Sequence, residues 1–364
     1  MGIPSAGKVM GCLLPSIRGG VVKCADSGFS LLSCGQVGLW RMIFVSLTQC
    51  WRAQNLCMLT AYLTHPDCER HVMGPDHPEC PERLAALNDH LLIKGLLDCM
   101  QPEEAPVASD EQLLRVHDAA WLFQLQDLVP MEGYARLDAD TLINPFTLRA
   151  ARRAAGAAVR AVDLVLGGQA PNAFCAVRPP GHHAKRASGS GFCFFNNAAV
   201  GVAHALSAHG LKRVALVDFD VHHGDGSEDI FAGDERVLLC STYQVDLFPF
   251  RDTQPPAANV VLAPLPARSG GPALREAVQQ HWLPALAAFA PELVVISAGF
   301  DAHREDDMGN LGWSEADYQW LTEQILAQAQ ASAQGRIVSC LEGGYALSAL
   351  ARSAAAHLRV LVHA

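Results

Sequence analysis

The chain has 364 residues, half of them hydrophobic, and a formal net charge of −10 at pH 7. This composition is typical of a globular protein with a large core. With no run of Lys or Arg and a negative net charge, direct binding of nucleic acid is not expected, and no apolar run reaches the length of a membrane span.

The first 57 residues differ from the rest. They contain five of the twelve cysteines and show no clean period of 2 or 3.6 residues. We expect residues 1–57 to be an appendage of uncertain order, or the product of a misassigned start of translation, and residues 58–364 to form one globular domain. The cysteines include no C-x-x-C pair, so neither a disulfide framework nor a cysteine zinc site is indicated, and we expect a reducing, cytoplasmic setting.

From about residue 147 onward, short apolar runs alternate with stretches of helical length. The runs predict strands over residues 173–178, 213–219, 236–242, 292–299 and 336–342. The longer stretches predict helices over residues 196–210, 272–289 and 314–333. Because parallel strands need crossover connections, this alternation predicts an α/β fold, a single domain with a mostly parallel central sheet flanked by helices.

Chemically reactive side chains follow four of the five predicted strands. The segments are RPPGHHA (178–184), DFDVHHGDG (218–226), FDAH (300–303) and EGGY (342–345). Ligand sites of parallel sheets lie at the carboxyl ends of the strands, so all four segments would open on the same rim. Turn formation explains the glycines but does not require the His pairs. We therefore predict a functional site at this rim.

Three of these side chains suit a divalent metal. Asp220 and His222 are two positions apart and project to the same side of an extended segment. With Asp301 they make a set of three ligands that suits Zn²⁺ and leaves a position for water, as in catalytic sites. Fe²⁺ or cobalt would be bound by the same set.

A metal held by two carboxylates would acidify its water only weakly, so a nearby base is needed. His182 and His183 suit this role, and Asp218 and Asp225 are placed to orient their imidazoles. Tyr345 follows two glycines and is placed to donate to a developing oxyanion. For the other histidines near these segments or before them we expect no chemical role. We expect His223 to be a packed neighbour of the ligands. The remaining three are expected to be loop or surface residues: His65, His71 and His77.

Taken together, the segments resemble the zinc-dependent histone deacetylase family, which has the arginase–deacetylase fold. The matching segments are RPPGHHA, GFCFFNNAAV (191–200), VDFDVHHGDG, SAGFDA and LEGGY, in the family's order and spacing. GFCFFNN and NVVLAPLPARSGG (259–271) are more similar to class II and bacterial deacetylase-like amidohydrolases than to class I enzymes.

The resemblance implies zinc on the three predicted ligands. It implies that His183 is the main general base and acid, that His182 is an electrostatic partner, and that Tyr345 polarises the scissile carbonyl. Phe192 and Phe248 would form the walls of a narrow channel. Many relatives also hold K⁺ near the zinc, at positions that correspond to Asp218, Asp220, His222, Ser241 and Thr242.

Three features of the predicted channel rim affect which substrate we expect. The segment 241–256 lacks a His and a Gly-rich loop that relatives usually show there. Relatives specialised for acetylpolyamines carry a Glu at the position of Met308, and an apolar Met favours acyl-lysine or another neutral-stemmed amide. Asp140 is placed to orient the substrate backbone.

We therefore predict a metal-dependent amidohydrolase that deacetylates acetyl-lysine in a protein or peptide. Two alternatives stay open: an acetylpolyamine amidohydrolase, and a catalytically idle binder of acylated ligands. The expected partner is an acylated lysine or other acylated amine, and the sequence leaves homo-oligomerisation open.

Overall fold

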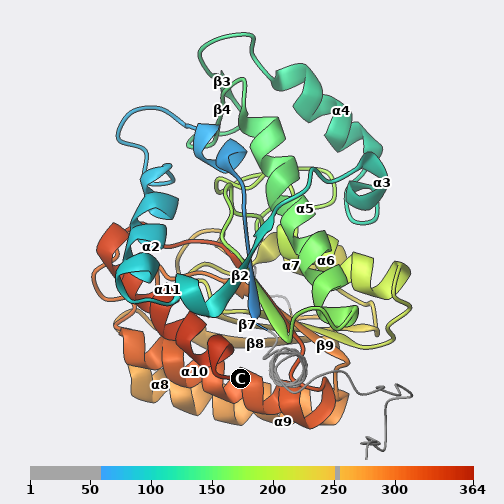
Figure 1. Ribbon diagram of the computed structural model, residues 1–364, viewed down its shortest axis with the longest axis vertical. Helices are drawn as coiled ribbons and strands as arrows, with labels where there is room; N and C mark the ends of the chain where they lie inside the picture. Colours follow the sequence, from blue (N-terminus) through green and yellow to red (C-terminus); the bar gives the residue numbers. More distant parts are fainter. Residues whose placement is uncertain (1–58, 251–254) are drawn as a thin grey trace, which may run out of the picture. The chain divides into compact units, whose positions relative to one another are not determined.

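The computed structural model describes residues 59–364 except 251–254. The expected appendage therefore lies outside the described residues, and its boundary stays a prediction. One eight-stranded sheet runs through the domain in the order β2-β1-β5-β10-β9-β6-β7-β8 (Figure 1), and every neighbouring pair is parallel. Its strands are β1 (Thr60–Thr64), β2 (Met100–Glu104), β5 (Asn172–Cys175), β6 (Val214–Asp218), β7 (Val237–Gln244), β8 (Val260–Leu265), β9 (Leu293–Ala298) and β10 (Ile337–Leu341).

All five predicted strands are confirmed. The sequence patterns missed β3 (Ala135–Arg136) and β4 (Leu142–Ile143), which form a small antiparallel sheet, and three strands of the large sheet. The missed strands of the large sheet are β1 next to one edge, β2 at that edge and β8 at the other edge. β2 has the sequence MQPEE, and β8 contains Pro264. Proline and charged residues are typical of edge strands, which have one unpaired side. A search for continuous apolar runs therefore finds the centre of the sheet more easily than its margins.

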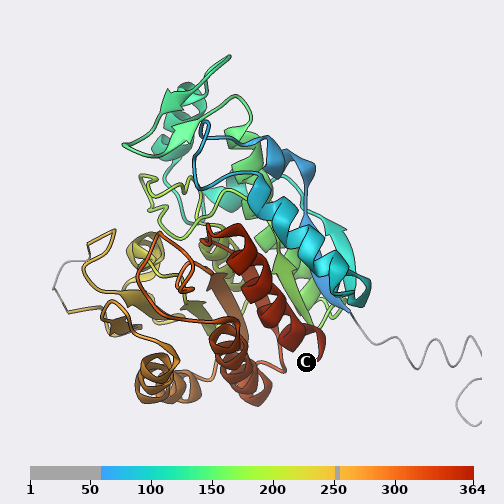
Figure 2. The same cartoon turned by 90° about the vertical axis from the view of Figure 1, so that its left-hand side faces the viewer.

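Helices cover the sheet on both faces. The helices are α2 (Glu82–Ile93), α3 (Asp110–Leu113), α4 (Ala119–Leu128), α5 (Thr147–Leu166), α6 (Asn197–Ser207), α7 (Asp225–Phe231), α8 (Gly271–Ala277), α9 (Leu283–Phe289), α10 (Glu315–Ser332) and α11 (Leu347–Val362). In one group α5 packs against α6, and in the other α11 packs against α2 and α10 (Figure 2). Every residue of β5, β6, β9 and β10 is buried, as expected for parallel strands covered on both sides. None of the described helices combines the length and apolarity that crossing a membrane requires.

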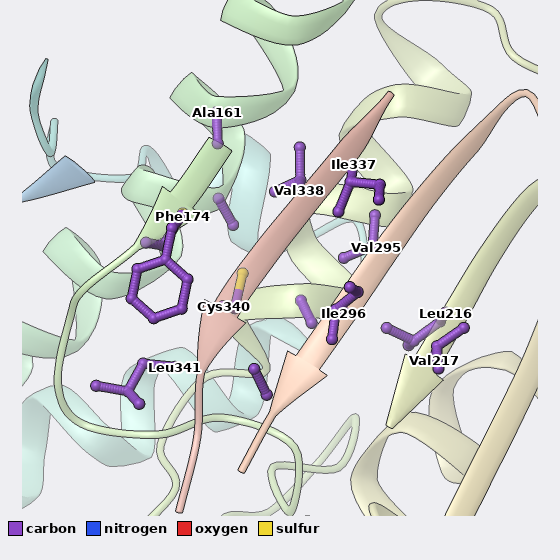
Figure 3. Close-up of a cluster of buried hydrophobic side chains, with 14 of the residues drawn as sticks. Ala161, Phe174, Leu216, Val217, Val295, Ile296, Ile337, Val338, Cys340 and Leu341 are labelled. Carbon is purple, nitrogen blue, oxygen red and sulfur yellow. The ribbon is translucent and has the colours of Figure 1, made fainter. Parts of the chain in front are cut away.

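The core lies where these helices meet the central strands. Phe174 of β5, Val338 of β10, Ile296 of β9 and Leu216 of β6 are fully buried in one continuous cluster (Figure 3). Ala161 of α5 is buried in the same cluster. This packing holds the strand ends, and the loops that follow them, in fixed positions.

The helix predicted over residues 272–289 is interrupted. α8 and α9 are joined by a π-helical turn, Val278–Trp282. Pro284 lies in the first turn of α9. Proline has no N–H to donate, and its ring clashes with the carbonyl four residues earlier, so a locally wider turn accommodates it.

Candidate active site

Four loops from the centre of the sheet meet at its carboxyl edge. β5, β10, β9 and β6 are consecutive neighbours in the sheet, and each is followed directly by one of the four predicted segments. The chain therefore brings together residues more than 160 positions apart, because parallel neighbours end at the same side of a sheet.

The three predicted metal ligands form one buried group. Atoms of Asp220, His222 and Asp301 that can bind a metal all lie within 4.8 Å of one another. Nδ1 of His222 lies 2.9 Å from Oδ1 of Asp220 and 3.3 Å from Oδ2 of Asp301. Oδ2 of Asp301 is buried and has no hydrogen-bond partner among the described residues. A divalent cation fits this donor set, because it would satisfy that oxygen and offset two buried carboxylates.

Two glycines allow the backbone to approach these carboxylates. A Cβ on Gly343 would lie 2.1 Å from Oδ2 of Asp301, and one on Gly299 would lie 2.0 Å from Oδ2 of Asp220. The amide of Gly343 donates to Oδ2 of Asp220 over 2.9 Å. Gly343, the first glycine of EGGY, therefore leaves room for the carboxylates of Asp301 and Asp220 and donates a hydrogen bond to Asp220. It also belongs to the loop that carries Tyr345.

The electrostatics of the group favour a positive charge at its centre. Burial and the negative charge of Asp220 together raise the pKa of Asp301 to about 7. Burial lowers the pKa of His222, but the hydrogen bond with Asp220 and the negative charges of both aspartates outweigh this effect and raise the pKa to about 10. Both shifts reflect the buried negative charge of the two aspartates, which a cation bound at the centre of the group would offset.

The tandem histidines are each paired with an aspartate. Nδ1 of His182 lies 2.9 Å from Oδ2 of Asp218, and Nδ1 of His183 lies 2.8 Å from Oδ1 of Asp225. Both rings are buried, with centroids 4.0 Å apart. With Nδ1–H donated to the carboxylate, Nε2 of each ring is left to face the site.

The surroundings shift the pKa values of the two histidines in opposite directions. Burial and the adjacent charge of His182 together lower the pKa of His183 to about 3. For His182 burial also acts to lower the pKa, but the charges of Asp218 and Asp220 raise it well above its usual value. The arrangement therefore combines a neutral imidazole, able to accept a proton, with a cationic one beside it.

Aromatic side chains surround the reactive groups. Phe248 packs edge-on against His183 with centroids 4.9 Å apart, and Phe192 packs edge-on against Tyr345 at 5.8 Å. Phe192 has a positive φ of 68°, a region that non-glycine residues rarely occupy. Its amide donates to Oγ1 of the buried Thr141 over 3.1 Å, which helps to hold it there. Burial raises the pKa of Tyr345 well above its usual value, so the phenol keeps its proton.

The predicted rim residues lie further out. Met308 is half-buried, and Asp140 is exposed. The carbonyl of Asp140 lies 3.0 Å from Nε2 of His77, and the ring of His77 packs edge-on against Phe192 at 4.8 Å. Burial and the neighbouring carboxylate of Asp138 raise the pKa of Asp140. Part of the predicted rim loop, residues 251–254, lies outside the described residues.

The three histidines expected in loops or at the surface do lie in loops, but two of them make contacts that the sequence did not indicate. His71 is fully buried, and its Nδ1 lies 2.8 Å from Oγ1 of Thr147 at the start of α5. His77 is a loop residue, but its contact with Phe192 places it beside the channel wall. These contacts arise because β1, which precedes both histidines, is a strand of the central sheet, so the loop after it packs within the same domain as the site. His223 does pack beside the ligands, between Glu228 at 2.6 Å and Ser241 at 3.1 Å.

Sequence reasoning missed a buried ion network under the EGGY loop. Arg178 makes two hydrogen bonds of 2.6 Å to Glu79, and Arg83 makes one of 3.1 Å. Arg83 also donates to the carbonyls of Gly344, over 2.7 Å, and Glu342. All three ionic side chains are fully buried. The Glu79–Arg83 spacing of four residues in HPECPERL was the available signal.

Replacing Glu79 by alanine will lower the free energy of unfolding by about 3–5 kcal/mol, because it leaves two buried guanidinium groups without their carboxylate. Urea unfolding monitored by circular dichroism measures the change. Glu82→Ala, at an exposed position three residues away, serves as control and should change stability by less than about 0.5 kcal/mol. Equal effects of the two substitutions would contradict this role of the network.

Two further carboxylates that were not predicted tie the loops together. Glu342 accepts hydrogen bonds from the amides of Gly181 at 2.6 Å and His182 at 3.1 Å, and burial raises its pKa to about 7. Asp306 is buried, and its Oδ2 accepts from the amides of Tyr345 at 2.6 Å and Ala346 at 2.8 Å. Each carboxylate thus joins two segments that come from different strands.

Comparisons with known proteins address the family to which the chain belongs. The model of the histone deacetylase domain matches residues 77–361, which is more than half of the chain. The chain belongs to the histone deacetylase family. It is 38% identical over 277 residues to a histone deacetylase-like amidohydrolase of Pseudomonas aeruginosa, a match that covers 74% of this chain and 72% of that protein.

Two other similar proteins extend the comparison. The human polyamine deacetylase HDAC10 is 37% identical over 327 residues, which are 84% of this chain but 48% of that protein. The crystal structure of the HDA15 HD domain superposes with a TM-score of 0.78 at 32% identity, covering 84% of this chain and 90% of that one. The arginase–deacetylase fold expected from the sequence is thereby confirmed.

Proposed function

We propose that the chain is a metal-dependent amidohydrolase that removes a short acyl group from an amine, with acetyl-lysine in a protein or peptide as substrate. Residues 58–364 would form the catalytic domain. One observation carries the proposal: the buried trio Asp220, His222 and Asp301 and the His183–Asp225 pair lie at the same edge of the sheet. A divalent-metal donor set beside a neutral, oriented imidazole is the arrangement that hydrolysis of an unactivated amide needs.

The trio would hold Zn²⁺ or Fe²⁺ through two carboxylates and Nδ1 of His222. When bound, such an ion supplies Lewis acidity to the substrate carbonyl and to a water molecule. Imidazole and carboxylate ligands do not by themselves separate zinc from iron. The metal that the purified protein carries therefore has to be measured.

His183 would accept the proton of the attacking water at Nε2 and deliver it to the departing amine. Its hydrogen bond to Asp225 holds the tautomer that this requires. His182, held cationic by Asp218, would remain protonated and stabilise negative charge that develops beside it. Asp218 and Asp225 thus act on the reaction through the two imidazoles.

Tyr345 would donate a hydrogen bond to the carbonyl oxygen as it becomes an oxyanion. Its raised pKa keeps the donor proton in place at neutral pH. Phe192 and Phe248, next to Tyr345 and His183, would line a channel for the alkyl stem of the substrate. Apolar walls suit an acylated, uncharged amine better than a free ammonium group.

A potassium ion near the metal is part of the same proposal. Ser241 is the register partner of Asp218, and Oγ1 of Thr242 is buried without a hydrogen-bond partner in the described part of the chain. A K⁺ ion coordinated there, together with Asp220 and His222, would satisfy that hydroxyl and offset the aspartates.

Acetylpolyamines are the second candidate substrates, favoured by the similarity to HDAC10. Met308 argues against them, because a thioether attracts no second ammonium group. Replacing Met308 by glutamate will raise kcat/KM for acetylspermidine relative to an acetyl-lysine peptide by about tenfold, the value of one favourable charge contact. Met308→Gln is the uncharged control. An unchanged ratio would show that this position does not select the substrate.

The proposal as a whole is tested on purified protein of known metal content. Cleavage of an acetyl-lysine peptide that is lost with chelator and restored with metal supports it. Cleavage of acetylated polyamines alone keeps the reaction and changes the substrate. Binding of acyl-lysine without cleavage of either substrate, with one metal in the active site of each chain, would overturn the proposal and favour an idle binder.

Asp306 is expected to position Tyr345. Asp306→Asn will lower kcat about tenfold with little change in KM, because the loop loses a charge-assisted pair of hydrogen bonds. In the Tyr345→Phe background the same substitution should have almost no effect, which a double-mutant cycle measures. Asp307→Asn, at an exposed neighbour, is the control. Additive effects of the two substitutions would contradict a role through Tyr345.

A further inference from the structure

A second group of side chains of metal-ligand type lies outside the proposed active site. Asp163 of α5, His204 of α6 and His209, just after α6, bring potential ligand atoms within 4.8 Å of one another. Nε2 of His204 and Nε2 of His209 each lie 2.8 Å from the same atom, Oδ1 of Asp163. The two imidazole rings are 77° apart in orientation, with centroids separated by 5.4 Å. Two imidazole nitrogens and a carboxylate oxygen thus converge on one point.

This group lies at the edge of the sheet opposite the active site. α5 ends at Leu166, before β5 begins, and α6 ends at Ser207, before β6 begins. Both helix ends therefore lie at the amino ends of the strands, whereas the proposed catalytic residues follow the carboxyl ends. An ion bound here would take no part in the hydrolysis and would instead join α5 to α6.

We propose that Asp163, His204 and His209 bind a divalent transition-metal ion such as Zn²⁺, Ni²⁺ or Cu²⁺. Imidazole and carboxylate are the ligands that these ions share. Metal–ligand bonds of about 2.0–2.2 Å place neighbouring ligand atoms about 3 Å apart, close to the separations present here. The exposed fractions of the three side chains, 41%, 8% and 27% in chain order, leave room for water in the remaining coordination positions.

The neighbouring side chain of Arg115 lowers the metal affinity of this site. Nη1 of Arg115 donates to Nδ1 of His204 over 2.7 Å, so the proton of that imidazole is on Nε2, facing Asp163. Metal binding at Nε2 moves the ring proton to Nδ1 and therefore breaks this hydrogen bond. Arg115 can withdraw while Nη2 keeps its contact with Glu111 at 3.1 Å. The arginine thus competes with the metal, and the site is weaker than the buried trio of the active site.

Zinc binding to the intact protein tests the site. Equilibrium dialysis against rising free Zn²⁺ should give two ions per chain, the second with a dissociation constant of about 1–100 μM. His209→Gln should weaken the second ion at least about tenfold, while the first ion and the turnover persist. Arg115→Met should tighten the second ion several-fold. His281→Gln, at an exposed histidine elsewhere, should leave both ions in place.

Pulsed EPR of Cu²⁺, added to protein with zinc in its active site, supplies a readout that does not depend on affinity. The second site should show two coordinated imidazoles in the wild type and one in His209→Gln. Two results would overturn the proposal: a single ion per chain at about 100 μM free zinc, or a second ion that survives both Asp163→Asn and His209→Gln. Either result would mean that His204 and His209 only donate hydrogen bonds to the carboxylate of Asp163 and bind no metal ion.

Discussion

Replacing His183 by alanine lowers kcat for an acetyl-lysine peptide about 10²–10⁴-fold, because the general base and acid is removed. The metal content stays at its wild-type value, since His183 is not among the three ligands and is held by Asp225 instead. Steady-state kinetics and elemental analysis of the same preparation measure both quantities.

The control for this result is His281→Ala, at an exposed histidine remote in sequence from the site segments, which keeps full activity. Asp225→Asn falls between the two variants, because the imidazole remains but loses the carboxylate that orients it. A His183→Ala protein with unchanged kcat and intact metal would remove this residue from the mechanism, and His182 would then be the only tandem histidine left to act as base.

Replacing Asp301 by asparagine removes both the metal and the activity. The side chain keeps its shape and can still accept from the amide of Val221, a contact of 2.9 Å, so the fold is retained. The neutral amide is a much poorer ligand than a carboxylate, and metal affinity should fall at least about 100-fold. Asp307→Asn, at an exposed aspartate of the same loop, keeps wild-type metal content.

Thermal unfolding with and without chelator separates metal loss from misfolding. A ligand at 100 times its dissociation constant stabilises the native state by about 2.7 kcal/mol, so chelator lowers the Tm of the wild type. The Tm of Asp301→Asn does not respond to chelator, because the variant carries no ion in the active site to lose. A variant that retains stoichiometric metal there would show that Asp220 and His222 suffice, and Asp301 would then not be a required ligand.

The sequence alone determined the fold class and predicted the place of the site. Central strands such as Val214–Asp218 are covered on both faces, so they appear as continuous apolar runs that local inspection detects. Parallel strands end on one side, which let Asp220 and Asp301 be assigned to one rim although 81 positions separate them. The family resemblance added the expected roles of His183 and Tyr345.

Only the tertiary structure revealed what holds the site together. Asp306 supports the Tyr345 loop from 39 positions away, and Arg83 reaches the carbonyl of Gly344 across 261 positions. The sequence around Asp306 does not distinguish it from an exposed aspartate, and the Glu79–Arg83 spacing indicates an ion pair but not the contact of Arg83 with the Tyr345 loop. The strand Met100–Glu104 was missed for a related reason, since its polar residues lie at a sheet edge.

The physical reason for this division is the distance along the chain over which the interactions act. Hydrophobic periodicity, turn residues and short motifs depend on interactions within a few residues, so they can be seen in the sequence. Burial of an ionic side chain such as Glu79 is favourable only when the fold supplies its partners, here Arg178 from 99 positions away. Those partners are chosen by the packing of the whole domain, and the tertiary structure alone decides them.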